Sequence, residues 1–165
     1  MSSFLRSPLV FGFAAVAALA GAYIFQYGFG LAPCPLCLYQ RWPYMAAIAF
    51  SLLAYSFRHK PLYGVWLGLL ALSFWLSAAL ALFHVGVEQH WWRGLDSCQG
   101  QAIPTNLEEL RAMIENAQPA RCDEIAWSFL GISIAGYNLI YAAIMGYFAT
   151  RFALKDAAHG QTQAR

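Results

Sequence analysis

The chain has 165 residues, of which 60% are hydrophobic and only 11% are charged, and its formal net charge is +2. A soluble domain carries about 25% charged residues, so this composition argues against a soluble globular protein. The small net charge, without a basic patch interleaved with aromatic residues, also argues against a nucleic-acid-binding protein. A membrane protein fits the composition best.

Four apolar blocks along the chain predict four membrane spans. They occupy about residues 9–29, 35–57, 62–83 and 129–150. A helix needs about 20 apolar residues to cross a bilayer, and the second block reaches that length only if its helix begins near Pro35. We expect an all-α membrane protein, a four-helix transmembrane bundle in a single domain over residues 1–152. A cleaved signal peptide is the alternative for the first block, but its apolar run is longer than a signal-peptide core and three more spans follow.

Charged residues are divided unequally between the two ends of the expected bundle. One end holds six basic residues and one acid: Arg6, Arg58, Lys60, Arg151, Lys155 and Arg165, with Asp156. The other end holds seven of the eight acidic residues. Because loops rich in Lys and Arg stay in the cytoplasm, we expect both termini and the turn at residues 58–60 to be cytoplasmic.

The loop at about residues 84–128 is the only long polar segment, and it lies on the outer side in this topology. Within it, Thr105 and Glu108 form a capping box, which predicts a helix over residues 106–117. This helix has an apolar side, so it either lies on the membrane surface or packs against its own bundle. The tail at residues 153–165 has no apolar face to bury, and we expect it to be disordered.

The stretch "PCPLCLYQRWPY" places two cysteines at the mouth of the second span. Pro35 suits the first turn of a helix, so Cys34 is expected at the N-cap and Cys37 at the third helical position. The N-terminal end of a helix favours negative charge, and therefore favours the thiolate form of a cysteine. Arg41 lies four residues after Cys37, on the same helix face, although its side chain could instead reach for the membrane interface.

Other uses of this cysteine pair are less consistent with the sequence. A structural zinc site takes four close ligands, and we expect no metal here. Covalent haem attachment needs CxxCH, whereas Leu38 follows Cys37. A purely structural disulfide between Cys34 and Cys37 would close a tiny loop and remove little chain entropy. A redox pair is the interpretation that remains.

Cys98 and Cys122 lie in polar, loop-like contexts, on the same outer side as the first pair. Disulfides form and persist in that compartment. A bond between them would close a long mobile loop, exposed to attack by the thiolate of another protein. A stapled structural loop is the alternative. An exposed pair and a pair at the mouth of a span together indicate that electrons pass from the former to the latter.

At this point the sequence resembles a known family. "CPLCLYQR" is similar to the CxLCxxxR signature of the bacterial disulfide bond formation protein B (DsbB) family, and "CDEIAWSFLG" resembles its pattern around the last span. The resemblance covers about residues 9–150 and includes the four-span order with a long second outer loop. It implies a multi-pass protein of the bacterial inner membrane, surrounded by lipid, with its cysteines on the periplasmic side.

The resemblance also implies an activity, namely quinone-dependent oxidation of a periplasmic thioredoxin-like dithiol protein (DsbA-like), which supports disulfide bond formation. Cys98 would form the mixed disulfide with that partner and Cys122 would resolve it. Cys34 and Cys37 would lie next to the cofactor, ubiquinone or menaquinone, and Cys37 would reduce it.

Two further residues acquire implied roles from the same resemblance. Arg41 would bind the quinone, and His84 falls near a family position that lines the quinone site. His84 could equally be a hydrogen-bonded histidine at the membrane interface. Gln40 departs from the pattern, because some members carry an acid at this position.

Three rival functions remain for comparison. An enzyme of the vitamin K epoxide reductase type has its CxxC on the final span, whereas here it follows the first. A non-catalytic scaffold or transporter with two structural disulfides would be expected to bury charge in its spans. Spans one, three and four contain no Asp, Glu, Lys or Arg. A module that only docks the partner would need only the loop pair, not Arg41 and the first pair.

Overall fold

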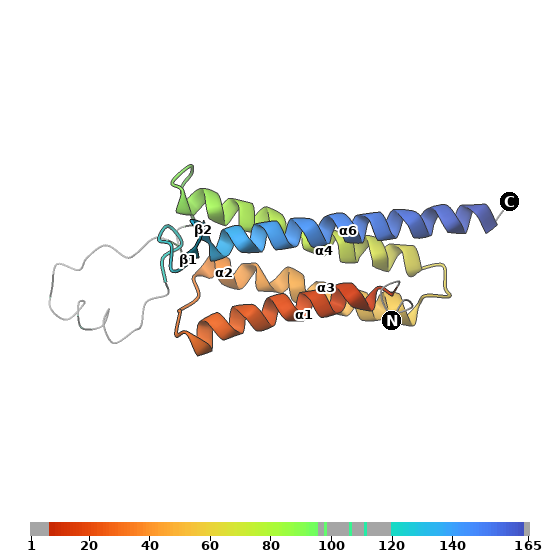
Figure 1. The fold of residues 1–165 in the computed structure, drawn as a ribbon, viewed down its shortest axis with the longest axis horizontal. Helices are drawn as coiled ribbons and strands as arrows, with labels where there is room; N and C mark the ends of the chain where they lie inside the picture. The colour runs from red at the N-terminus through yellow and green to blue at the C-terminus, as the bar shows by residue number, and fades with distance from the viewer. Residues whose placement is uncertain (1–6, 96–97, 99–105, 107–110, 112–119, 164–165) are drawn as a thin grey trace.

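The computed structural model describes residues 7–95, 98, 106, 111 and 120–163 (Figure 1). Its helices are α1 (Leu9–Tyr23), the π-helical turn η1 (Ile24–Gly28), α2 (Pro35–Tyr39), α3 (Arg41–Ser56), α4 (Tyr63–Glu88) and α6 (Ile134–Gln163). Two short antiparallel strands, β1 (Ser128–Phe129) and β2 (Ile132–Ser133), precede α6. The long helices run side by side, with α2 and the strands at one end and the C-terminus at the other.

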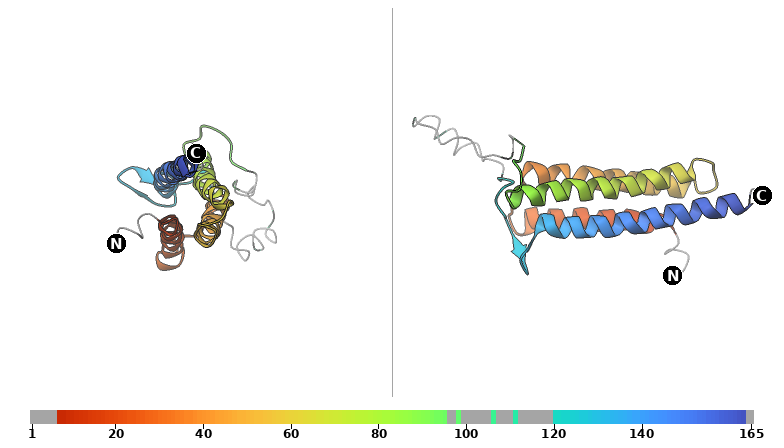
Figure 2. Two further views of the ribbon diagram at one scale, coloured as in Figure 1. Left: turned by 90° about the vertical axis from the view of Figure 1, so that its right-hand side faces the viewer. Right: turned by 90° about the horizontal axis from the view of Figure 1, so that it is seen from above.

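The long helices form a bundle in which α1 packs on α3, α3 on α4, and α4 on α6 (Figure 2). Small residues lie at these contacts, and Ala15, Ala47 and Ala142 are fully buried. Small side chains let helix backbones approach closely, which is how helices pack when lipid removes the hydrophobic driving force. By contrast, α1 and α6 make few contacts with each other, so space remains between these two helices.

Two segments of the described chain are long and apolar enough to cross a membrane by themselves, Leu9–Gly28 and Tyr63–Glu88. The four-span count therefore stays a prediction. Helix α3 has only 16 residues. However, Gln40 alone separates it from α2, so helical structure continues almost unbroken from Pro35 to Ser56.

The structure differs from the expected fourth span at both of its ends. Leu130 and Gly131 have left-handed φ angles of 49° and 78°, which make the two-residue turn between β1 and β2, so α6 begins at Ile134 rather than near residue 129. At its other end α6 continues through Gln163, although residues 153–165 were expected to be disordered. Residues 153–158 include Ala153, Leu154, Lys155, Ala157 and Ala158, which have high helix propensity and favour the first turns of this extension. The helix expected over residues 106–117 falls almost entirely outside the described residues.

A close contact on α4 fixes the start of the outer loop. The indole of Trp92 lies on Gly86, stacks on Phe83 with ring centroids 5.9 Å apart, and donates Nε1–H to the Phe83 carbonyl at 2.9 Å. A Cβ at position 86 would occupy the space of the indole ring. Trp92 therefore depends on a glycine at this position.

We expect Gly86→Ala to lower the stability of the folded chain by about 1–3 kcal/mol, the usual cost of overpacking. Thermal unfolding in detergent measures this change. Gly68→Ala is the matched control, because it lies on the same helix and its Cβ would meet nothing within 4 Å. Equal melting temperatures for the two variants would contradict the contact between Gly86 and Trp92.

Candidate active site

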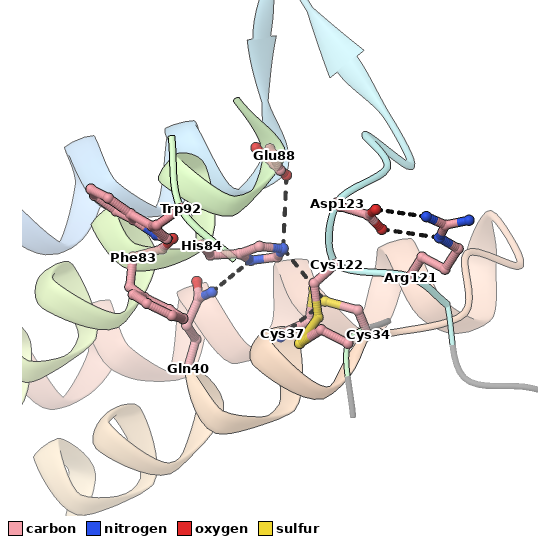
Figure 3. The surroundings of a disulfide bond; sticks show 11 residues. Cys34, Cys37, Gln40, Phe83, His84, Glu88, Trp92, Arg121, Cys122 and Asp123 are labelled. Carbon is pink, nitrogen blue, oxygen red and sulfur yellow. Dashed lines mark hydrogen bonds and ion pairs between the residues drawn. A yellow bond between two sulfur atoms is a disulfide. The ribbon is translucent and has the colours of Figure 1, made fainter. Parts of the chain in front are cut away.

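Both cysteine pairs lie in one buried cluster at the end of the bundle that carries α2 (Figure 3). Cys34, Cys98 and Cys122 are 4%, 2% and 0% exposed, and Cys37 packs against them. The expectation of an exposed loop pair is therefore wrong. Leu36 and Val87 cover the cysteines, and such long-range packing leaves no periodic signal in the loop sequence.

The two pairs are in different redox states. Cys98 and Cys122 form a disulfide, with their Cα atoms 5.0 Å apart. Cys34 and Cys37 are free thiols whose sulfur atoms lie 2.8 Å apart. An oxidised pair therefore packs directly on a reduced pair, which is the arrangement required for exchange between them.

The N-terminus of α2 has the predicted geometry. Cys34 is the N-cap residue in an extended conformation, and Pro35 follows as the first helical residue. The backbone N–H of Cys37 donates to the sulfur of Cys34 at 3.2 Å. Because Cys34 itself caps the helix, its sulfur lies on the same face of α2 as the sulfur of Cys37. The prediction that Cys34 is the N-cap and Cys37 the third helical residue is confirmed.

Arg41 extends from the start of α3 toward α1. Its Nη1 donates to Oε1 of Gln26 at 2.7 Å, and its guanidinium lies over the ring of Tyr23, 4.9 Å from the centroid. Its Nε is buried without a partner among the described residues. Gln26 lies in the π-helical turn η1, a feature that often occurs at functional sites and that sequence patterns did not reveal.

His84, on the last turns of α4, contacts the first cysteine pair directly. Its Nε2 lies 3.5 Å from the sulfur of Cys34, and its Nδ1 lies 2.9 Å from Nε2 of Gln40. The sequence placed His84 only at the mouth of a span, whereas the structure places it beside the sulfur of Cys34.

Glu88, one helical turn after His84, is a buried acid that sequence reasoning missed. Its Oε1 lies 3.9 Å from Nε2 of His84, and its Oε2 accepts a hydrogen bond from the Ser133 hydroxyl at 2.5 Å. The backbone N–H of Gly136 donates to that hydroxyl in turn. The i,i+4 spacing of His84 and Glu88 was the available signal in the sequence.

A cavity of about 550 Å³ lies beside the reduced pair, mainly between α1 and α6. Its walls are largely apolar and include Ala18, Gly21 and Ile144. Cys37, Arg41 and His84 line the same cavity, so it brings together predicted site residues from three helices. Its volume is in the range of about 300–1,000 Å³ that small-molecule sites occupy.

The residues around this cavity fit a quinone. A flat apolar ring suits the walls, and Arg41, which lines the cavity, is a hydrogen-bond donor for a carbonyl oxygen. The set is less suited to a metal ion. The sulfurs of Cys34 and Cys37 and the Nε2 of His84 lie within 4.8 Å of one another, but they are three atoms where a structural zinc site takes four. The predicted absence of a metal stays a prediction.

A surface ion pair lies next to Cys122, at the outer rim of the cavity. The Arg121 guanidinium donates to both carboxylate oxygens of Asp123, at 3.0 and 2.6 Å. These hydrogen bonds hold the pKa of Asp123 below its usual range. Arg121 and Glu124 also line the cavity, so they add charge to its largely apolar lining.

Comparison with known proteins gives a consistent result. The sequence profile of the family described as "Disulfide bond formation protein DsbB" matches residues 6–151. The chain is 35% identical over 136 residues to disulfide bond formation protein B of Psychrobacter sp. (strain PRwf-1), covering 77% of this chain and 78% of that protein. It is 32% identical over 157 residues to the protein of the same name from Chromohalobacter salexigens, covering 86% of each. It is also 34% identical over 128 residues to the uncharacterized protein RP370 of Rickettsia prowazekii, covering 76% of this chain and 73% of that protein. No solved structure matches the chain significantly.

Proposed function

The chain belongs to the disulfide bond formation protein DsbB family, and from this premise we propose that it is a quinone-dependent protein thiol oxidase. Membership of the family makes the chain a disulfide oxidoreductase of the membrane. The proposal adds the electron donor, a periplasmic thioredoxin-like (DsbA-like) dithiol protein, and the acceptor, a membrane quinone. One partner dithiol and one quinone would yield one partner disulfide and one quinol.

One observation carries the proposal: an oxidised pair, Cys98–Cys122, packs on a reduced pair, Cys34 and Cys37, beside an apolar cavity. The partner's thiolate attacks the Cys98–Cys122 bond, forms a mixed disulfide with Cys98 and releases the Cys122 thiolate. The partner's second thiol then attacks the mixed disulfide, which leaves the partner oxidised and Cys98 and Cys122 reduced. Exchange with a Cys34–Cys37 disulfide then moves the electron pair inward. Bound quinone supplies an acceptor for two electrons and two protons.

The residues around the inner pair have defined roles in this proposal. Arg41, held by Gln26 and Tyr23, binds the acceptor and keeps positive charge near the Cys37 thiolate. His84 places its Nε2 beside the sulfur of Cys34. The apolar walls of the cavity exclude water from this chemistry.

The proposed location rests on family membership and on the distribution of charge along the chain. The proposed single domain, residues 1–152, crosses the bacterial inner membrane four times, with both termini in the cytoplasm. The start of α1 and the end of α6 lie at the end of the bundle away from the cysteines, which supports this topology. The cysteine cluster would then face the periplasm, where the partner is.

The test is an anaerobic assay with purified chain, a reduced thioredoxin-like periplasmic dithiol protein and a soluble quinone analogue, followed by quinone absorbance. We expect wild type to consume quinone and oxidise the partner. The Cys98→Ser, Cys122→Ser double variant should lose oxidation of the protein partner but still pass electrons from dithiothreitol to quinone through Cys34 and Cys37.

Two outcomes would contradict the proposal. Quinone consumption by the double variant at the wild-type rate with the protein partner would exclude the loop pair from the path. No consumption by wild type with either reductant would leave a membrane scaffold with a structural disulfide.

A further inference from the structure

A chain of polar side chains, buried except for the half-buried Asn138, connects α3 and α6 to His84. The Tyr44 hydroxyl donates to Oδ1 of Asn138 at 2.5 Å, and Nδ2 of Asn138 donates to Oε1 of Gln40 at 2.5 Å. The side-chain nitrogen of Gln40 then lies 2.9 Å from Nδ1 of His84. Each side chain donates to the next, so the chain has a single direction that ends at the imidazole.

This direction determines where the imidazole carries its proton. An amide nitrogen is only a donor, so Nδ1 of His84 must accept. A neutral imidazole has one protonated nitrogen, which is then Nε2. That nitrogen faces the sulfur of Cys34 at 3.5 Å and the carboxylate of Glu88 at 3.9 Å, both of which can accept.

We propose that Gln40 is a positioning residue that holds His84 as the neutral tautomer protonated on Nε2, and so presents a fixed N–H donor to the sulfur of Cys34. The inference rests on the proposed function for its role in the reaction. Gln40 is 6% exposed, and burial keeps water from competing for its amide. Its place in the helix joint between α2 and α3 sets its side chain between His84 and Asn138.

The fixed donor acts when charge develops on Cys34. In exchange with the loop pair, a loop thiolate forms a new S–S bond to one inner sulfur, the Cys34–Cys37 bond breaks, and its electron pair remains on the other inner sulfur. The N–H bond of His84 is kept throughout, and it stabilises Cys34 whenever that sulfur bears the charge. The Cys37 backbone N–H is a second donor to the same sulfur.

The direct test is ¹⁵N NMR of the imidazole nitrogens in detergent micelles, which distinguishes protonated from unprotonated nitrogen. His84 signals are assigned by comparison with His84→Asn. We expect wild type to show Nδ1 unprotonated and Nε2 protonated. In Gln40→Glu the new carboxylate is an acceptor, so Nδ1 of His84 should gain a proton.

The kinetic test is Gln40→Met, which keeps the length of the side chain and removes the donor. We expect turnover with partner and quinone to fall about tenfold, because a hydrogen bond to a charged atom has about that effect. Gln89, exposed at the end of α4, provides the control: Gln89→Glu and Gln89→Met should change neither the imidazole spectrum nor the turnover.

The outcomes separate this inference from the proposed function. A proton on Nδ1 of wild-type His84 would overturn the assignment, whatever the activity. The expected spectrum with unchanged turnover in Gln40→Met would overturn the positioning role. The expected spectrum in a wild-type chain that consumes no quinone would overturn the proposed function and leave the tautomer assignment supported.

Discussion

Replacement of Cys37 by serine is expected to abolish quinone reduction. A hydroxyl does not form a disulfide, so Cys34 loses its partner at 2.8 Å and the inner pair can no longer carry two electrons. The loop disulfide Cys98–Cys122 is untouched and should still exchange once with a reduced partner. The variant should therefore oxidise at most about one partner dithiol per chain and then stop.

The measurement combines quinone absorbance with alkylation of free thiols on the partner. Wild type should consume quinone until the partner is exhausted, whereas Cys37→Ser should show a single exchange and no quinone loss. Cys34→Ser is the matched control, because it removes the other cysteine of the same inner pair. Continued quinone loss in Cys37→Ser would remove this residue from the electron path.

Arg41→Lys is expected to raise the KM for quinone about tenfold to a hundredfold, with a smaller change in kcat. The planar guanidinium of Arg41 lies over the ring of Tyr23 and donates to Gln26, and Arg41 lines the cavity. A lysine ammonium keeps the charge but cannot make both contacts from one planar group. The expected change corresponds to about 1.5–3 kcal/mol, the contribution of a hydrogen bond to a charged group.

Arg58→Lys is a close control for this prediction. Arg58 also lies over a tyrosine, with its guanidinium 4.5 Å from the centroid of Tyr55, but at the turn between α3 and α4 and outside the cavity. Steady-state kinetics at varied quinone should find the Arg58→Lys variant unchanged. Equal KM values for wild type and Arg41→Lys would show that Arg41 does not bind the acceptor.

Local sequence signals predicted the local parts of the site. Pro35 after Cys34 was sufficient for the capped start of α2, because an N-cap and a first-turn proline depend only on neighbouring residues. The left-handed turn at Leu130 and Gly131 was missed, although glycine after a short apolar run is a known turn signal. The missed hairpin moved the predicted start of the last helix by about one turn.

The long-range parts could not be predicted from the same signals. Gln40 and Asn138 are 98 residues apart in sequence, and their hydrogen bond depends on how α3 and α6 face each other. The burial of Cys98 and Cys122 likewise depends on packing against α2 and α4. The loop around these cysteines is polar in composition, and this led to the expectation that the cysteines are exposed. The two sulfurs are nevertheless buried.

The position of the cavity between α1 and α6 affects how the reaction should be measured. These helices make few contacts, and the cavity walls between them are largely apolar, so under the proposed function the acceptor is a hydrophobic molecule dissolved in the bilayer. The relevant concentration is then moles of quinone per mole of lipid or detergent, rather than moles per litre of solution. Diluting an assay with detergent at constant total quinone would thus slow the reaction, and the natural rate would follow the composition of the membrane.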